Sequence, residues 1–290
     1  MKNIKNFDEL INLAISKKST IAVAAANDSN IIEACVLASK KGLANFILVG
    51  DKSKIREITD EFEIIDEPDA VKAASTAVSL VREGKASSLM KGSCETSTIL
   101  KAALNRETGI RTDKKLSHLA AFEVPSYHKL LFVTDAAINI APNFEDKKAI
   151  LENAVMALNN IDLKPKVALL AAKEKIDEKM PVTIEYGEIV RLHKEGFLHN
   201  SVIEGPLALD NAVSKESCEI KGIKTEVGGD ADLLFTPNIE SGNILYKSLS
   251  FLCGAKTGGI VLGALCPIIL TSRADSPYSK LVSIALSLVF

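Results

Sequence analysis

Apolar residues alternate along the chain between two patterns. Short unbroken apolar runs are typical of strands buried on both faces, and longer stretches with apolar residues every three or four positions are typical of helices. The first half has expected strands at "TIAVAAA" (20–26), "NFILVG" (45–50) and "ASSLMKG" (86–92). Between them, "PDAVKAASTAVSLVREG" (68–84) has Pro at its start and Gly at its end, as helices often do. This alternation predicts a mostly parallel sheet covered by helices on both faces.

The pattern changes in the middle of the chain. "LSHLAAFEVP" (116–125) and "HKLLFVTDAAIN" (128–139) are strand runs separated by a short Ser-Tyr link. No helix fits between them, so we expect them to pair antiparallel. We take this hairpin as a domain boundary. The prediction is two three-layer α/β/α domains with mostly parallel sheets, the first formed by 1–116 plus 258–290 and the second by 117–257.

The strand and helix alternation then resumes. Helices are expected over 144–160 and over "ESGNILYKSLSFL" (240–252), and a last strand at "CPIIL" (266–270). "GAKTGG" (254–259) has the wrong order and spacing of Gly, Lys and Thr for a phosphate loop, so we interpret it as a Gly-rich connection. "VGGDAD" (227–232) does not match a dinucleotide-binding turn.

Composition narrows the class of protein. Among 290 residues, 47% are hydrophobic and 25% charged, which is enough apolar material for sizeable cores. The net charge of −2 leaves no basic surplus for nucleic acid. The N-terminus does not look like a signal peptide, and the apolar C-terminus "LVSIALSLVF" is too short to cross a bilayer. We expect a cytoplasmic protein without membrane partners, whose last helix packs on a core or a subunit interface, and hence a homo-oligomer.

Small and polar residues follow several expected strands. Ligands of open α/β sheets bind beyond the carboxyl ends of the strands. The residues at these ends, which we predict to bind substrate, are Lys91, Gly92, Thr134, Asp135, Asn139, Pro237, Asn238, Glu240 and Asn243. Because they come from both expected domains, we predict an active-site cleft between the domains.

Several of these residues also have a simpler interpretation. Lys91 could be a solvated strand end, and Asp135 could cap a helix. Asn238 and Glu240 could be the cap and first-turn acid of the helix that follows. Asn243 is harder to explain in this way, since Asn is a poor former of helix interiors.

The last strand leads into a candidate anion site. Ser276-Pro277 fits a helix N-cap followed by Pro at the first helical position, and free N–H groups at a helix start favour an anion. Arg273 offers a planar fork that matches phosphate oxygens, and Ser272 offers a hydroxyl. Asp275 is an acceptor and hence a candidate base. A capped helix with a surface arginine is the alternative.

No established nucleophile motif is present. The sequence has no GxSxG elbow, and its four histidines show no triad spacing. Cys94 precedes a probable helix start, which would lower the pKa of its thiol and make it a candidate nucleophile. A small buried thiol is the simpler interpretation. The five cysteines show no metal-ligand spacing, so we expect no metal site.

Long segments of the chain resemble one known family. These segments are "LMKG" (89–92), "TSTILKAALN" (96–105), "GIRT" (109–112), "LSHLAAFEVPSYHKLLFVTDAAINIAP" (116–142), "ADLLFTPNIESGNILYK" (231–247) and "CPIILTSRADS" (266–276). Together they resemble the phosphate acetyl/butyryltransferase family, and its butyryl-transferring members most. The resemblance covers nearly the whole chain, and the motif over 116–142 is its most specific part.

The resemblance implies a function and a mechanism. It implies an isocitrate/isopropylmalate dehydrogenase-like fold and the reversible transfer of a short-chain acyl group, butyryl, between CoA and inorganic phosphate. CoA and phosphate are then substrates, with no cofactor, and the CoA thiolate attacks the acyl phosphate directly. Ser272 and Arg273 match the family's catalytic strand-end pair. In acetyl-transferring relatives a carboxylate further into the helix deprotonates the thiol, but this chain has Ser279 there, so Asp275 is our candidate base.

Other functions remain open at this point. An acetyl preference is one, because acyl-chain length depends on pocket volume. A metal- and NAD-dependent decarboxylating dehydrogenase would need clustered aspartates and several arginines for a substrate carboxylate, and neither cluster is visible. A non-catalytic acyl-CoA-binding module would have no need of the polar strand ends.

Overall fold

The computed structural model describes residues 4–17, 19–271 and 275–290. Contacts group the chain into two compact units. Unit 1 comprises Met1–Asn6 and Leu116–Thr257, and unit 2 comprises Phe7–Lys115 and Gly258–Phe290.

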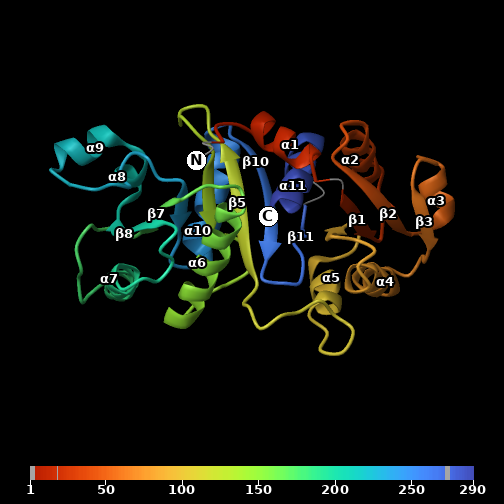
Figure 1. Ribbon diagram of the computed structural model, residues 1–290, viewed down its shortest axis with the longest axis horizontal. Helices are drawn as coiled ribbons and strands as arrows, with labels where there is room; N and C mark the ends of the chain where they lie inside the picture. Colours follow the sequence, from red (N-terminus) through yellow and green to blue (C-terminus); the bar gives the residue numbers. More distant parts are fainter. Residues whose placement is uncertain (1–3, 18, 272–274) are drawn as a thin grey trace. The chain divides into compact units, whose positions relative to one another are not determined.

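Unit 2 alternates strands and helices as the sequence predicts (Figure 1). Its elements are α1 (Phe7–Ile15), β1 (Ser19–Ala24), α2 (Ser29–Lys40), β2 (Ala44–Gly50), α3 (Lys52–Arg56), β3 (Glu63–Asp66), α4 (Ala70–Arg82), β4 (Ser88–Lys91), α5 (Thr96–Ala103), β10 (Lys256–Leu262, which begins at the boundary), β11 (Ile268–Ile269) and α11 (Pro277–Val289). The strand order is β3-β2-β1-β4-β11-β10. Neighbouring strands are parallel except β10, which is antiparallel to β11.

Helices cover both faces of the unit 2 strands. In Figure 1, α1, α2 and α11 lie on one side of β1 and β2, and α4 and α5 lie on the other. The predicted helix over 68–84 is α4, which begins where the Asp69 carboxylate accepts the N–H groups of Val71 and Lys72. It ends before Gly84, whose φ of 73° suits glycine. Every residue of α11 from Lys280 to Val289 is buried, so the apolar C-terminus packs on a core as expected.

The interpretation of "GAKTGG" as a connection is wrong, because β10 begins at Lys256. The glycines have a packing role instead. A Cβ on Gly258 would lie 2.9 Å from the backbone nitrogen of Ser283, so α11 can approach β10 only where no side chain intervenes. The N–H of Gly259 donates to Ser283 Oγ at 3.0 Å, which fixes the helix on the strand.

Unit 1 also alternates strands and helices after an initial hairpin. Its elements are β5 (Ser117–Glu123), β6 (Leu131–Thr134), α6 (Phe144–Asn159), β7 (Lys166–Leu170), α7 (Pro181–Lys194), β8 (Val202–Leu207), α8 (Leu209–Val213), α9 (Lys215–Ile220), β9 (Leu233–Phe235), α10 (Ile239–Lys247) and the π-helical turn η1 (Ser248–Leu252). The strand order is β5-β6-β9-β7-β8, with β6, β9, β7 and β8 parallel. The predicted antiparallel hairpin is confirmed by the pairing of β5 with β6.

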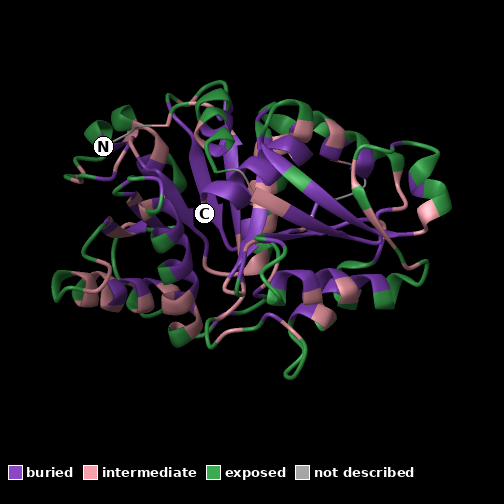
Figure 2. Cartoon of the chain, turned by 45° about the vertical axis from the view of Figure 1, so that its right-hand side comes forward, coloured by how far each residue is buried: buried purple, intermediate pink, exposed green. Residues whose placement is uncertain are grey.

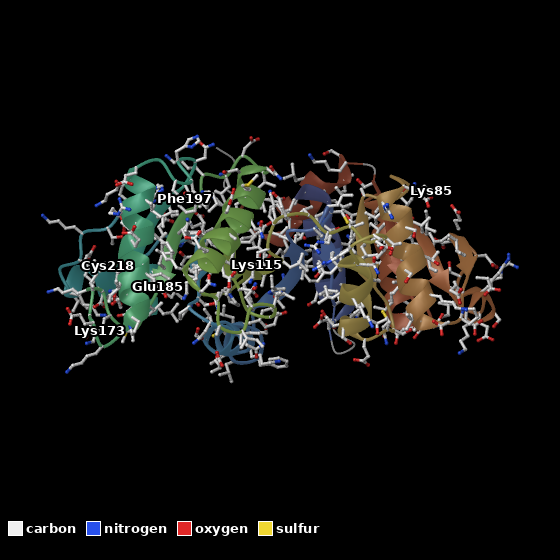
Figure 3. All side chains as sticks on the ribbon, turned by 90° about the horizontal axis from the view of Figure 1, so that it is seen from below. Lys85, Lys115, Lys173, Glu185, Phe197 and Cys218 are labelled. Atoms are coloured by element: carbon white, nitrogen blue, oxygen red, sulfur yellow. The ribbon has the colours of Figure 1, made fainter. Side chains whose placement is uncertain are left out.

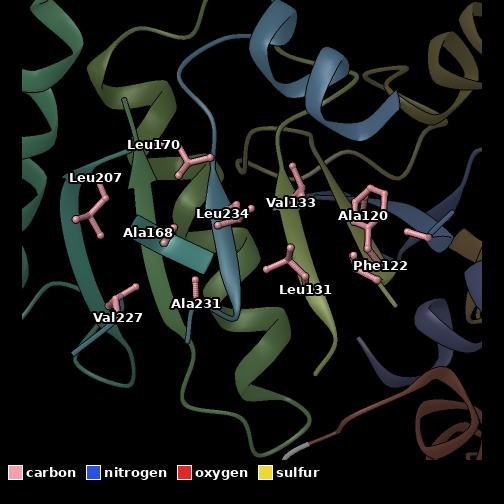
Figure 4. Close-up of a cluster of buried hydrophobic side chains, with 13 residues drawn as sticks. Ala120, Phe122, Leu131, Val133, Ala168, Leu170, Leu207, Val227, Ala231 and Leu234 are labelled. Carbon is pink, nitrogen blue, oxygen red and sulfur yellow. The ribbon is translucent and has the colours of Figure 1, made fainter. Parts of the chain in front are cut away.

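Successive residues of β5 serve opposite faces of the unit 1 sheet. Ala120 and Phe122 join a buried cluster with side chains of β6, β7 and β9 (Figure 4), against which Tyr246 of α10 packs. Ser117 lies on the other face, where its hydroxyl accepts a hydrogen bond from Asn153 of α6. Most strands are buried, and most helices have one exposed side (Figure 2); the edge strand β3 and the buried helix α11 are exceptions. Together with the strand pairing, this confirms the predicted α/β class with mostly parallel strands. In the described ranges, no helix is long and apolar enough to cross a membrane.

Candidate active site

The carboxyl ends of β1, β4 and β11 lie at one edge of the unit 2 sheet. These strands are neighbours and run parallel, with Val23 beside Met90 and Met90 beside Ile269. Lys91 is the last residue of β4, and Thr271 follows the end of β11. The edge therefore collects groups that are able to contact a ligand.

Lys91 is buried, with 7% of its surface exposed, which contradicts the alternative of a solvated strand end. Its Nζ donates to the carbonyl oxygens of Gly92 at 3.1 Å and Cys94 at 3.3 Å. Gly92 is required by packing, since a Cβ there would overlap the backbone carbonyl oxygens of Ala24 and Ala25. The chain thus places an ammonium group at this edge with a tight backbone turn beneath it.

Cys94 lies before α5 and is 5% exposed. Burial raises the pKa of its thiol, and the positive charge of Lys91 opposes this shift without cancelling it. The expectation that a helix start lowers this pKa is therefore wrong. The simpler interpretation, a small buried thiol, agrees with the structure.

The strand end "TSRADSP" is described in part. Ser272 and Arg273 lie outside the described residues. The predicted helix start is confirmed, because Ser276 Oγ accepts the N–H of Ser279 at 3.1 Å and Pro277 is the first residue of α11. Asp275 is half-buried just before this cap, and its carbonyl oxygen accepts a hydrogen bond from Lys280 Nζ.

In unit 1, the residues after β6 form a turn held by its own side chains. Oδ1 of Asp135 accepts the N–H groups of Ala137 and Ile138 at 2.9 and 3.0 Å. Its Oδ2 accepts a hydrogen bond from Asn139 Nδ2 at 2.6 Å. Thr134 is fully buried, and its hydroxyl donates to the carbonyl oxygen of His118 at 2.7 Å. Asp135 therefore caps a turn rather than a helix.

Helix α10 docks on this turn. Asn243 Nδ2 donates to the carbonyl oxygen of Ala136 at 3.1 Å, which explains an Asn inside the helix. A Cβ on Gly242 would overlap the carbonyl oxygen of Asp135, so only glycine allows this approach. Asn238 is the N-cap, with Oδ1 accepting the N–H of Ser241 at 3.0 Å, and Glu240 is an exposed first-turn acid. Both agree with the simpler interpretation of these two residues.

The structure brings four predicted residues of unit 1 to one turn: Thr134, Asp135, Asn139 and Asn243. Asn139 donates to the Asp135 carboxylate, whereas the other two donate to carbonyl oxygens of neighbouring residues. Pro237 precedes the α10 cap and is half-buried, and the Glu240 side chain points into solvent rather than towards this turn.

His118 belongs to the same region, although sequence reasoning missed it. Its ring lies 6.1 Å from that of Tyr246 between centroids, and its Nδ1 is buried without a hydrogen-bond partner among the described residues. Burial lowers the pKa of the imidazole, and the Asp135 carboxylate opposes this shift. Period-2 alternation from Ala120 and Phe122 was the available signal, since it places His118 on the face covered by α10.

Within residues 4–17, 19–271 and 275–290, no group of three or more His, Cys, Asp or Glu side chains is arranged to hold a metal ion. A cavity of about 620 Å³ lies towards the amino ends of the unit 2 strands, between Phe46, Phe62 and Lys85. Lys85 is labelled in Figure 3. This cavity is lined by none of the predicted site residues.

Known proteins resemble the chain over nearly its full length. A family model described as phosphate acetyl/butaryl transferase matches residues 59–288. A phosphate butyryltransferase of Clostridium acetobutylicum is 43% identical, over 98% of this chain and 97% of its own. A phosphate acetyltransferase of Rhizobium meliloti is 40% identical, over 98% and 93%. The crystal structure of a branched-chain phosphotransacylase from Enterococcus faecalis V583 is 34% identical, with a TM-score of 0.86 over 93% of this chain and 98% of that one. The resemblance noted in the sequence is thus confirmed, and the chain belongs to the phosphate acetyl/butyryl transferase family.

Proposed function

We propose that this protein is an acyltransferase that reversibly transfers a short-chain acyl group, butyryl, between CoA and inorganic phosphate. The observation that carries the proposal is the buried ammonium group of Lys91 at the carboxyl end of β4, in a chain of this family. Phosphate-bearing substrates need such a local cation because the net charge of the chain is −2.

The reaction needs one nucleophile and one leaving group. The CoA thiol loses its proton to a base, and the thiolate sulfur attacks the carbonyl carbon of the acyl phosphate. The bond between that carbon and the bridging oxygen breaks, and its electron pair leaves with inorganic phosphate. Cationic and hydrogen-bonding groups accelerate this step by stabilising the charge on the carbonyl oxygen and the departing phosphate.

We assign roles to the predicted residues on this basis. Arg273 and Ser272 hold the phosphoryl group, as the family resemblance implies, and Lys91 adds positive charge. Asp275 is the base that takes the thiol proton, since position 279 is a serine.

The predicted unit 1 residues are assigned to substrate binding in two ways. Pro237, Asn238 and Glu240 lie at the start of α10, where a ligand is able to reach them. Thr134, Asp135, Asn139 and Asn243 maintain the turn on which α10 docks. Gly92 of unit 2 lets the chain turn tightly after Lys91.

The remaining expectations are part of the same proposal. We propose that the protein works in the cytoplasm without a metal or cofactor and has neither nucleic acid nor membrane as a partner. Self-association into a homo-oligomer is supported by exposed apolar side chains of unit 1, namely Ile244, Phe251 and Leu252, which are 67%, 78% and 84% exposed.

A second candidate is the same reaction with acetyl as the preferred group. It is favoured by the 40% identity to a relative named phosphate acetyltransferase. The two candidates differ in pocket volume, and one methylene group changes discrimination by about 1–3 kcal/mol.

Release of free CoA from acyl-CoA, detected with a thiol reagent, tests the function. We expect release from butyryl-CoA that requires inorganic phosphate, and slower release from acetyl-CoA at equal concentration. Release of CoA at the same rate with and without inorganic phosphate would indicate a hydrolase and contradict the proposal. Faster release from acetyl-CoA would select the second candidate.

A further inference from the structure

Lys280 is an enclosed ammonium group one turn into α11. Only 1% of its surface is exposed, and lysine is almost never fully buried unless it is paired. Its Nζ donates to the carbonyl oxygen of Asp275 at 2.5 Å. A carbonyl oxygen is uncharged, so this bond orients the ammonium group but does not balance its charge.

No carboxylate in the described part of the chain forms an ion pair with Lys280. The contrast with two other buried lysines is clear, since Lys129 pairs with Asp232 at 2.6 Å and Lys147 with Glu185 at 2.5 Å. The residues outside the described ranges, 1–3, 18 and 272–274, include no aspartate or glutamate that could supply the missing negative charge. An unbalanced buried charge is costly, so its retention calls for an anion from outside the chain.

The position of Lys280 in its helix also favours a nearby anion. It lies at the N-terminal end of a thirteen-residue helix, where the helix dipole repels a cation and attracts an anion. Thr271, which follows β11, is 3% exposed, and its Oγ1 has no hydrogen-bond partner among the described residues. Among the described residues, Thr271 therefore has a hydroxyl without a hydrogen-bond partner, and Lys280 has an ammonium group that donates to a carbonyl oxygen but forms no ion pair.

We propose that Lys280 is a positioning residue whose missing counterion is phosphate. It holds the carbonyl oxygen of Asp275, and its charge acts on phosphate through the low-dielectric interior rather than by direct contact. The inference rests on the proposed function for the identity of the anion. It adds to that function a buried cation on which phosphate affinity depends.

The test compares Lys280→Met with Lys72→Met, a control at an exposed position of α4. Inorganic phosphate is titrated into each protein without an acyl donor, and the rise in Tm is measured. We expect Lys280→Met to keep or raise the Tm without phosphate, because a buried charge is removed, and to lose most of the phosphate-induced rise. The KM for phosphate should increase at least about tenfold, with the KM for acyl-CoA little changed, given the strength of a charge pair in a protein interior. Lys280→Arg should restore most of the phosphate affinity.

A Lys280→Met protein with the wild-type phosphate response would overturn the inference and leave Lys280 a structural residue. If this variant folds poorly, the same titration on Lys280→Gln decides. Failure of the proposed function gives a different result. A wild-type protein that shows no acyl transfer but still binds phosphate through Lys280 contradicts the function alone.

Discussion

The thiol of Cys94 lies close to the ammonium group of Lys91, yet it is poorly suited to attack a carbonyl. The thiolate is the reactive form, and burial raises the pKa of this thiol more than Lys91 lowers it. The Cys94 carbonyl oxygen, by contrast, orients Lys91 at 3.3 Å. The contribution of this residue at the site is therefore made by its backbone.

We accordingly expect Cys94→Ser to retain most of the acyl-transfer activity, within about a threefold change, because a conservative swap removes no reactive group. Initial rates at several concentrations of both substrates should follow sequential kinetics. Ping-pong kinetics, or an acyl group trapped on Cys94 of the wild-type protein, would replace direct attack by a covalent mechanism.

We expect His118 to contribute to the pH dependence of stability. Burial lowers its pKa in the folded state, so the unfolded chain binds a proton that the folded chain does not as the pH falls below about 6.5. The neutral imidazole therefore costs no stability above that pH. Below it, the free energy of unfolding declines by at most about 1.4 kcal/mol per pH unit for one proton.

The prediction is that His118→Phe loses less stability than the wild-type protein between pH 7 and pH 5, measured by urea unfolding. Phe keeps a ring beside Tyr246 but cannot take up a proton. The matched control is His199→Phe at an exposed position, which should follow the wild-type curve. If His118→Phe loses as much stability between pH 7 and pH 5 as the wild-type protein, the His118 imidazole is not the cause of the pH dependence.

The position of a single functional residue is predictable from the sequence in some cases and not in others. Lys91 could be located in advance, because an apolar strand that ends in Lys-Gly places the lysine at the strand's carboxyl end. His118 and Lys280 could not, because their importance lies in missing partners. The His118 Nδ1 without a hydrogen-bond partner, and the Lys280 ammonium group without an ion pair, both among the described residues, are recognised only when the surrounding side chains have positions.

Among the elements, α10 can approach the turn at Asp135 closely because position 242 is a glycine. Gly242 lies against the carbonyl oxygen of Asp135, and a backbone carbonyl in a bonded turn has little freedom to move. Gly187 in α7 is a useful contrast. A Cβ there would lie 2.8 Å from Cδ1 of Ile176, the end of a flexible side chain that is 62% exposed.

Gly242→Ala should therefore destabilise the protein by about 1–3 kcal/mol through overpacking, despite the better helix propensity of alanine. It should also weaken acyl transfer, since α10 carries Asn238 and Glu240. Gly187→Ala should be neutral or slightly stabilising by urea unfolding. Equal changes in stability for the two substitutions would mean that the turn at Asp135 moves to accommodate the added methyl group, and that the position of α10 does not depend on this contact.

The elements themselves were predicted unevenly, for a physical reason. The β5–β6 hairpin was predictable, since the short link between the two apolar runs leaves no room for a helix, although the strands end at Glu123 and begin again only at Leu131. The strand β10 was not, because its glycines suggest a loop unless the helix packed on them is known. Gly258 is needed where α11 approaches, and that contact joins segments far apart in the sequence.

At the scale of the whole molecule, charge is the main constraint on binding CoA and phosphate. The chain has 35 lysine and arginine residues against 37 aspartate and glutamate residues, so its overall field does not attract anions. Affinity must come from cations at particular positions. We propose that Lys91 and Lys280 are two such groups, since both are buried where a low dielectric strengthens the effect of a charge, and we assign Arg273 to the same task.

This distribution of charge leads to the last prediction, which concerns metal removal. In the proposed reaction, side-chain cations and a helix N-terminus supply the positive charge that phosphate needs, so we expect no electrostatic requirement for a divalent cation. Dialysis against EDTA should leave the phosphate-dependent release of CoA from butyryl-CoA within about twofold of its starting rate, since no charge-stabilising donor is lost. Adding Mg²⁺ back should change little. Lys91→Met should instead lower the rate strongly in both conditions, because it removes one of the fixed charges. Loss of activity in EDTA that Mg²⁺ restores would show that the metal, and not the lysines, neutralises the phosphate.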